Sequence, residues 1–89
     1  MQQVVVTLPK ALLRLFPDAK PETTVRAASV RDVFDALDAR WPGMRDRLCD
    51  STPAVRRHIN VFVDGERATL ETRIAPGTDV FIMTAISGG

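Results

Sequence analysis

The stretch Ser29-Val-Arg-Asp-Val-Phe-Asp-Ala-Leu-Asp-Ala-Arg-Trp41 decides the fold, because it carries the strongest secondary-structure signal in the chain. Ser29 is a favourable N-cap, and Asp32, three residues later, forms an acidic variant of the capping box. Pro42-Gly43 ends the pattern. The stretch therefore predicts an amphipathic helix, whose apolar face must be covered by a second layer of structure. The residues of that face have helical spacing: Val30, Val33, Phe34, Leu37 and Trp41.

Segments rich in β-branched and aromatic residues lie on both sides of this helix. They predict strands over residues 3–8, 22–27, 58–63 and about 79–86, with a short return strand at 66–68 after the turn signal Asp64-Gly65. Residues 10–16 predict a connecting loop or a single helical turn, and residues 44–49 predict a further helical turn. This order predicts an α+β fold in which a mixed sheet of four to five strands packs on one main helix.

Length and composition limit the classes of function. A chain of 89 residues predicts one domain. The 12 basic and 11 acidic residues give a net charge of +1, which offers no general argument for nucleic acid or membrane as a partner. The single cysteine, Cys49, cannot form an internal disulfide, and the N-terminus carries no signal-peptide pattern. We therefore expect a cytoplasmic protein.

The last predicted strand leads directly into Ser87-Gly88-Gly89. Glycine has no Cβ, so such an end can adopt any backbone conformation and enter a channel that is too narrow for other residues. The alternative interpretation is an ordinary frayed terminus whose residues carry no function.

The order of elements and the terminal Gly88-Gly89 resemble the β-grasp fold of ubiquitin, and more closely the MoaD/ThiS family of sulfur-carrier proteins. The resemblance rests on the capped helix at 29–41, on residues 58–66 and on residues 76–89, and it covers essentially the whole chain. It implies a single β-grasp domain over residues 1–89 with a flexible Gly-Gly tail. Residues 84–89 read Thr-Ala-Ile-Ser-Gly-Gly, whereas molybdopterin-synthase small subunits usually carry prolines and an alanine there. The longer segment at 42–57 is more similar to carriers that feed cysteine, siderophore or other thio-metabolite synthesis.

The resemblance implies a carrier protein that is not itself an enzyme. An E1-like activating enzyme of the MoeB/ThiF type would use ATP to adenylate the Gly89 carboxylate, and sulfur would then displace AMP to leave a thiocarboxylate. The thiocarboxylate would pass its sulfur to a biosynthetic enzyme, and the carrier would bind no cofactor itself. Two alternatives remain: a ubiquitin-like modifier joined to target lysines through Gly89, and an interaction module whose glycines are incidental.

Strand alternation predicts a docking surface for these partners. Val80 and Ile82 should face the helix, so their neighbours on the last strand should point to the open face of the sheet. The predicted partner-binding residues are Phe62, Phe81, Met83 and, next to the tail, Ile86. Apolar side chains exposed together are costly unless something covers them. The alternatives to a partner are the loop at 10–17 or a dimer.

Other candidate sites are less persuasive. His58 has no second ligand at metal-binding spacing, so we predict no metal site. Cys49 has no recognisable base beside it and is interpreted as a structural cysteine. Asp35 and Asp38 lie on the polar side of the predicted helix and are not interpreted as a catalytic pair. No glycine-rich phosphate loop is present, so the chain itself is not expected to bind ATP.

Overall fold

The predicted helix is α2 (Val30–Arg40) in the computed structural model, which describes residues 2–49, 55 and 58–84. Its start is capped as the sequence predicts. The Ser29 hydroxyl accepts the Asp32 N–H at 3.3 Å, and the Asp32 carboxylate accepts the Ala28 N–H at 3.0 Å. Trp41 lies just beyond the helix, as its C-cap, and is partly buried against the core. The four large apolar side chains of α2 are fully buried, so the predicted helix face is confirmed: Val30, Val33, Phe34 and Leu37.

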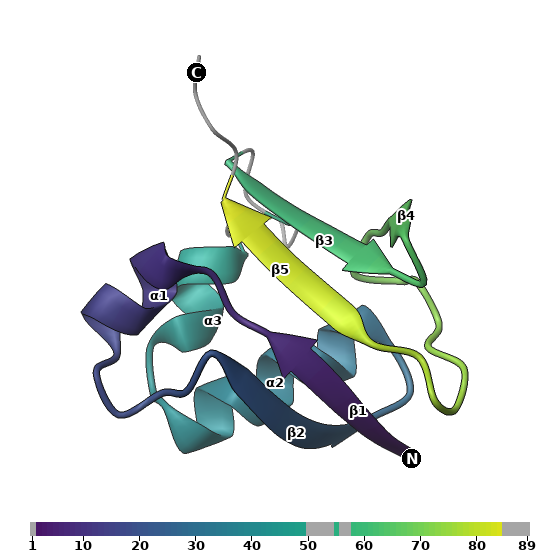
Figure 1. Ribbon diagram of the computed structural model, residues 1–89, viewed down its shortest axis with the longest axis horizontal. Helices are drawn as coiled ribbons and strands as arrows, with labels where there is room; N and C mark the ends of the chain where they lie inside the picture. Colours follow the sequence, from purple (N-terminus) through teal and green to yellow (C-terminus); the bar gives the residue numbers. More distant parts are fainter. Residues whose placement is uncertain (1, 50–54, 56–57, 85–89) are drawn as a thin grey trace.

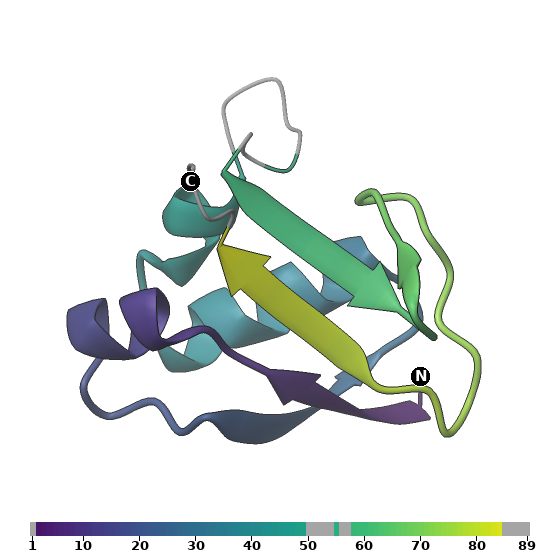
Figure 2. The same cartoon turned by 45° about the horizontal axis from the view of Figure 1, so that its top comes forward.

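Five strands form one mixed sheet in the order β2-β1-β5-β3-β4. They are β1 (Gln2–Thr7), β2 (Glu22–Ala27), β3 (Ile59–Val63), β4 (Glu66–Arg67) and β5 (Val80–Thr84). β1 and β5 pair in parallel and the other neighbours are antiparallel. Figures 1 and 2 show α2 crossing one face of this sheet. The predicted α+β class, with its mixed sheet and one main helix, is therefore confirmed.

The core lies between α2 and the sheet face that it covers. Side chains of alternate strand residues enter it, as the period of a β-strand requires. Every second residue of the three central strands is buried there: Val4, Val6, Ile59, Val61, Val63, Val80 and Ile82. The predicted orientation of the β3 and β5 residues toward the helix is confirmed. The neighbours of all these residues are left on the opposite, open face.

Two short helices contribute further buried side chains to this core. Residues 10–16, for which the sequence left a loop or one helical turn open, form the helix α1 (Lys10–Leu15), which buries Leu12. Helix α3 (Met44–Leu48) follows Gly43, whose φ of 97° is in the left-handed region that favours glycine. The predicted helical turn at 44–49 is therefore confirmed, although Cys49 is its C-cap. No helix in the described ranges has both the length and the apolarity needed to span a membrane.

Some predicted strand boundaries were wrong by one residue. β1 ends at Thr7, although Leu8 is still buried, and the start of β3 excludes His58, which is exposed in a turn. β4 has only two residues, and β5 begins at Val80. The predicted end of the last strand at 86 lies outside the described residues. Asp64 and Gly65 have φ angles of 54° and 79°, which confirms the predicted tight turn.

Candidate functional site

The strand that leads to the terminal glycines, β5, is the middle strand of the sheet. Its neighbours are β1 on one side and β3 on the other, so both edges of β5 are paired. The predicted site residues Ile86, Ser87, Gly88 and Gly89 lie outside the described residues, and their roles remain predictions. The structure therefore describes the base from which this segment continues, and the surface around that base.

Phe81 lies at the centre of a row of side chains that crosses the open face. Thr7 of β1 is its partner on one side and Phe62 of β3 on the other, and Arg67 of β4 is in turn the partner of Phe62. Met83 pairs with Asn60 two residues further along β5. Because side chains directly opposite one another in a sheet are in contact range, this register brings Phe62 and Phe81 together.

These apolar side chains are accessible to solvent. The exposed fraction is 44% for Phe81 and 52% for Met83, and Phe62 is half-buried. The predicted exposure of this face is therefore confirmed, whereas its use by a partner remains a prediction. Coverage by the segment at 10–17 was the wrong alternative, because α1 packs Leu12 into the core and leaves Phe81 and Met83 exposed. We call Phe62, Phe81, Met83 and Val5 the apolar face.

Val5 is a member of this face that the sequence-based prediction of the docking surface missed. It is 37% exposed and lies on β1, two residues before the partner of Phe81. Strand alternation predicted that Val5 points to the opposite side from Val4, without deciding which side faces the core, and the structure buries Val4 and leaves Val5 exposed. What the sequence pattern did not specify was that the first strand pairs directly with the last one. That pairing places Val5 near Phe81.

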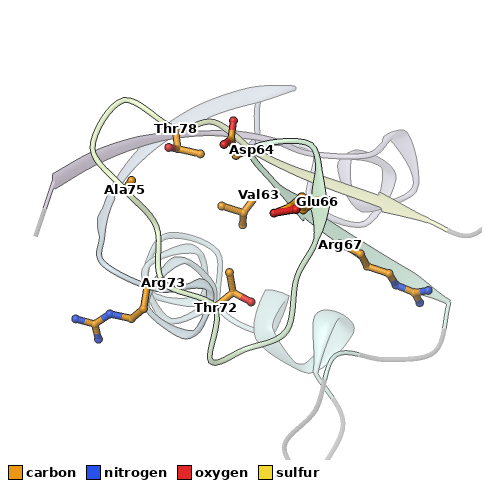
Figure 3. Close-up of a pocket in the computed structure, with 8 residues that line it drawn as sticks. All are labelled: Val63, Asp64, Glu66, Arg67, Thr72, Arg73, Ala75 and Thr78. Carbon is orange, nitrogen blue, oxygen red and sulfur yellow. The ribbon is translucent and has the colours of Figure 1, made fainter.

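A hollow of about 380 Å³ lies at the opposite end of β5, where that strand begins. Figure 3 shows Glu66 turned toward the hollow, whereas Arg67 and Arg73 extend away from it. Val63, which lines it, is the partner of Val80, the first residue of β5. The hollow is therefore remote from Thr84, where the described part of β5 ends, and it does not belong to the surface around the tail.

Acidic residues on α2 hold neighbouring segments in place. Asp35 forms an ion pair with Arg45 at 3.2 Å. One carboxylate oxygen of Asp38 accepts the Gly43 N–H at 3.0 Å and the Arg45 N–H at 3.1 Å. These contacts tie the start of α3 to α2, so both aspartates have structural partners. The sequence-based interpretation that they are not a catalytic pair agrees with these contacts, but it did not foresee the role of Asp38 at the start of α3.

Cys49 is buried, with 5% of its surface exposed, and it is a free thiol. Burial raises the pKa of the Cys49 thiol, because removal from water disfavours the thiolate, and the neighbouring Arg45 opposes this shift. The thiol is therefore poorly suited to nucleophilic chemistry, as its interpretation as a structural cysteine predicts. Within the described ranges, no group of three or more His, Cys, Asp or Glu residues could hold a metal ion.

The chain is similar to known small carrier and modifier proteins. The family model described as "ThiS family" matches residues 12–89. The sulfur carrier protein CysO of Mycobacterium tuberculosis is 30% identical over 92 residues, covering 97% of this chain and 98% of that protein. Small archaeal modifier protein 1 of Haloferax volcanii is 34% identical over 62 residues, covering 70% of this chain and 71% of that protein.

A solved structure has a fold similar to that of this chain. The crystal structure of the Amycolatopsis orientalis BexX/CysO complex contains a chain that superposes on this one with a TM-score of 0.83 and 28% sequence identity. The superposition covers 97% of this chain and 99% of that one. The similarity in fold therefore extends over nearly the full length of both chains.

Proposed function

Since this chain belongs to the ThiS family, we propose that it is a sulfur carrier whose reacting group is the carboxylate of Gly89. An E1-like enzyme of the MoeB/ThiF type catalyses attack of that carboxylate on the α-phosphorus of ATP, and pyrophosphate leaves. A sulfide equivalent held by a partner then attacks the acyl carbon and AMP leaves, so that Gly89 ends in a thiocarboxylate. Adenylation is needed because a free carboxylate has a poor leaving group. The chain supplies the acyl group and its placement, while its partners supply the catalytic groups.

The observation that carries this proposal is the apolar face on the strand that leads to Gly88 and Gly89. Phe81 and Met83 are exposed on β5 itself, so a protein that binds them lies beside the base of the tail. Exposed apolar patches of this kind are typical of protein interaction sites. Both neighbours of β5 hold that base in position. Less conformational entropy is therefore lost when the carboxylate is placed in a partner's active site.

Two partners follow from this proposal. The first is the activating enzyme, and the second is a biosynthetic enzyme that accepts the sulfur. A relative of this chain, the Amycolatopsis CysO, has been crystallised in a complex with BexX. We propose that the acceptor enzyme of this chain docks on the same apolar face, because it too must reach the carbon of Gly89. We place both steps in the cytoplasm and involve neither nucleic acid nor a membrane.

A second candidate function is protein modification, and one comparison favours it. The chain is 34% identical over 62 residues to a relative named small archaeal modifier protein 1. The same acyl-adenylate that sulfide captures can be captured, through further steps, by the amine of a lysine. In that case Gly89 would end in an isopeptide bond with a target protein.

Intact mass measurement separates these two functions. The chain is produced with its activating enzyme, ATP and a sulfur donor, next to a matched variant that lacks Gly88 and Gly89. A mass gain of one sulfur-for-oxygen exchange, seen only with the full-length chain, supports the carrier. Adducts of the chain on other proteins support the modifier. If the full-length chain and the truncated variant behave alike in both assays, the tail is incidental and both functions are wrong.

A further inference from the structure

Among the residues that the structure describes, no strand pairs with the outer edge of β2. β2 is the first strand of the sheet and pairs only with β1. The Leu8 N–H donates to the Pro21 carbonyl at 2.7 Å, so the backbone groups of residue 21 point toward β1. The direction of the backbone N–H and C=O groups alternates along an antiparallel strand, so these groups of Thr23 and Val25 also point toward β1. The N–H and C=O groups of Glu22, Thr24 and Arg26 therefore point outward.

This open edge ends at Ala28. The next outward-pointing N–H after Arg26 is that of Ala28, and it donates to the Asp32 carboxylate at 3.0 Å. The Ala28 carbonyl accepts the Ile74 N–H at 2.9 Å. The segment at 69–74 thus covers the edge from residue 28 onward. In the part of the chain that the structure describes, Glu22–Arg26 is the stretch of β2 whose outward backbone groups have no strand beside them, and Figure 1 shows β2 at the border of the sheet.

The side chains of the same three residues share the open face of the sheet. Glu22, Thr24 and Arg26 are exposed, whereas Val25 is buried against α2. The Thr23 hydroxyl, on the helix side, accepts a hydrogen bond from Arg40 at 2.7 Å. The open edge therefore carries an acidic, a neutral and a basic side chain at a spacing of two residues.

We propose that a second copy of this chain pairs with this edge, antiparallel, about a two-fold axis at Thr24. In this register Thr24 faces the partner's Thr24, and Glu22 faces the partner's Arg26. The two-fold axis repeats this contact, so Arg26 faces the partner's Glu22. Opposite charges and Thr–Thr pairs are both favourable directly across an antiparallel ladder. The outward groups of Glu22, Thr24 and Arg26 would form about six backbone hydrogen bonds with the same groups of the second copy.

Charge and backbone geometry select this register over its neighbours. A shift by one pair in one direction brings Glu22 opposite the partner's Ala28, whose outward groups are already bonded. A shift in the other direction brings Lys20 opposite the partner's Arg26, which places like charges together. Charged side chains on an edge strand usually prevent association. Here their signs and their spacing make the edge complementary to itself, which is what a two-fold interface requires.

The dimer leaves the apolar face accessible. β1 separates β2 from β5, so the paired edge is not the strand that carries Phe81 and Met83. An interface made by one strand per copy is smaller than that of stable dimers, so we expect an association that depends strongly on protein concentration. The two five-stranded sheets would then continue into one, with α2 of both copies on the same side.

Charge exchange tests the register. Sedimentation of the full chain, over a series from micromolar to millimolar concentration, should show a monomer–dimer equilibrium. Glu22→Arg alone and Arg26→Glu alone each place like charges opposite one another and should weaken the dimer at least about tenfold. The double variant with both changes restores opposite charges and should recover most of that loss. The proposal is wrong if the chain stays monomeric throughout the series. It is also wrong if the dissociation constant of the dimer is the same in all three variants as in the unchanged chain.

A covalent test locates the two-fold axis. Residues facing each other in a hydrogen-bonded antiparallel pair have Cα atoms about 5.5 Å apart, which is within reach of a disulfide. In a Cys49→Ala background, Thr24→Cys should give a disulfide-linked dimer under mild oxidation. Val5→Cys is the matched control, because it lies on the same face one strand further from the axis. Equal cross-linking at both positions, or none at Thr24→Cys, would contradict the proposed pairing.

Discussion

Phe81 of β5 and Phe62 of β3 lie directly opposite each other on the open face of the sheet. Aromatic pairs across strands attract each other, and here the pair is left partly in contact with solvent. The paired rings present one continuous apolar surface beside the strand that leads to the terminal glycines. A partner enzyme that covers this pair gains apolar burial at the position from which it must reach Gly89.

Phe81→Asp should therefore impair activation far more than folding. The change removes the central ring of the apolar face and introduces a charge that a partner would have to desolvate. We expect the kcat/KM for adenylation by the activating enzyme to fall at least about thirtyfold. Because Phe81 is 44% exposed, the free energy of unfolding should change by only about 1 kcal/mol. Pyrophosphate release and urea denaturation measure the two effects.

Ala75→Asp is the matched control for this experiment. It adds the same charge at an exposed position that lines the hollow near the start of β5, away from the apolar face. Its adenylation rate should stay within about twofold of the unchanged chain, since a rim charge mainly affects the rate of encounter. Equal losses in both variants would indicate a general charge effect and would contradict a docking role for Phe81.

Asp38→Ala should destabilise the fold, although Asp38 is only half-buried. Its carboxylate accepts two backbone N–H groups, those of Gly43 and Arg45, and so fixes the start of α3. Loss of this carboxylate should lower the free energy of unfolding by about 1–2 kcal/mol. Asp38→Asn keeps an acceptor oxygen and should lose less. Denaturant titration provides the measurement, with Asp18→Ala, at an exposed position, as the control. An equal loss of stability in all three variants would contradict a stabilising role for these two hydrogen bonds.

Alkaline pH should weaken the fold through Cys49. Burial raises the pKa of this thiol above the value of about 8.5 expected in the unfolded chain. The folded chain therefore keeps its proton at a pH where the unfolded chain has lost it. The corresponding stability is fully present below the unfolded pKa and is lost as the pH rises through the folded pKa.

Denaturant titration across the alkaline range measures this dependence. Cys49→Ala removes the titrating group, so the free energy of unfolding of that variant should fall less steeply with pH than that of the unchanged chain. The chain contains no tyrosine, which leaves few other groups that titrate in this range. Parallel pH profiles for the two proteins would show that the Cys49 thiol does not contribute.

The elements of the fold could be predicted from the sequence because their signals are local. The cap at Ser29 and Asp32 and the helical spacing that follows it are contained within α2, and alternation within each strand separates Val80 and Ile82 from Phe81 and Met83. The helix α1 was ambiguous, because residues 10–16 are too few to establish a period. Its apolar cluster predicted that a few side chains would reach the core, but it did not single out Leu12, which is the buried one.

The candidate site was predictable only where it depends on one strand. Alternation within the first strand separates Val5 from Val4, but the place of Val5 beside Phe81 depends on parallel pairing between the first and last strands. That pairing depends on the topology of the whole sheet. The two strands are not joined by a turn, so no local sequence signal predicts that they pair. The role of Asp38 was hidden for a similar reason, since its partners are backbone groups positioned by the bend at Gly43.

Gly89→Ala tests why the chain ends in glycine. A methyl group at this position removes the conformational freedom of glycine and widens the segment that must enter the activating site. The variant should fold normally, with an unchanged thermal midpoint, because the predicted role of Gly89 lies entirely in the partner's active site. Pyrophosphate release should fall at least about tenfold, whereas Ser87→Ala, which removes only a hydroxyl, should retain most of the activity. Normal release from Gly89→Ala would show that the activating site is wide enough for a side chain, and the two glycines would then need another explanation.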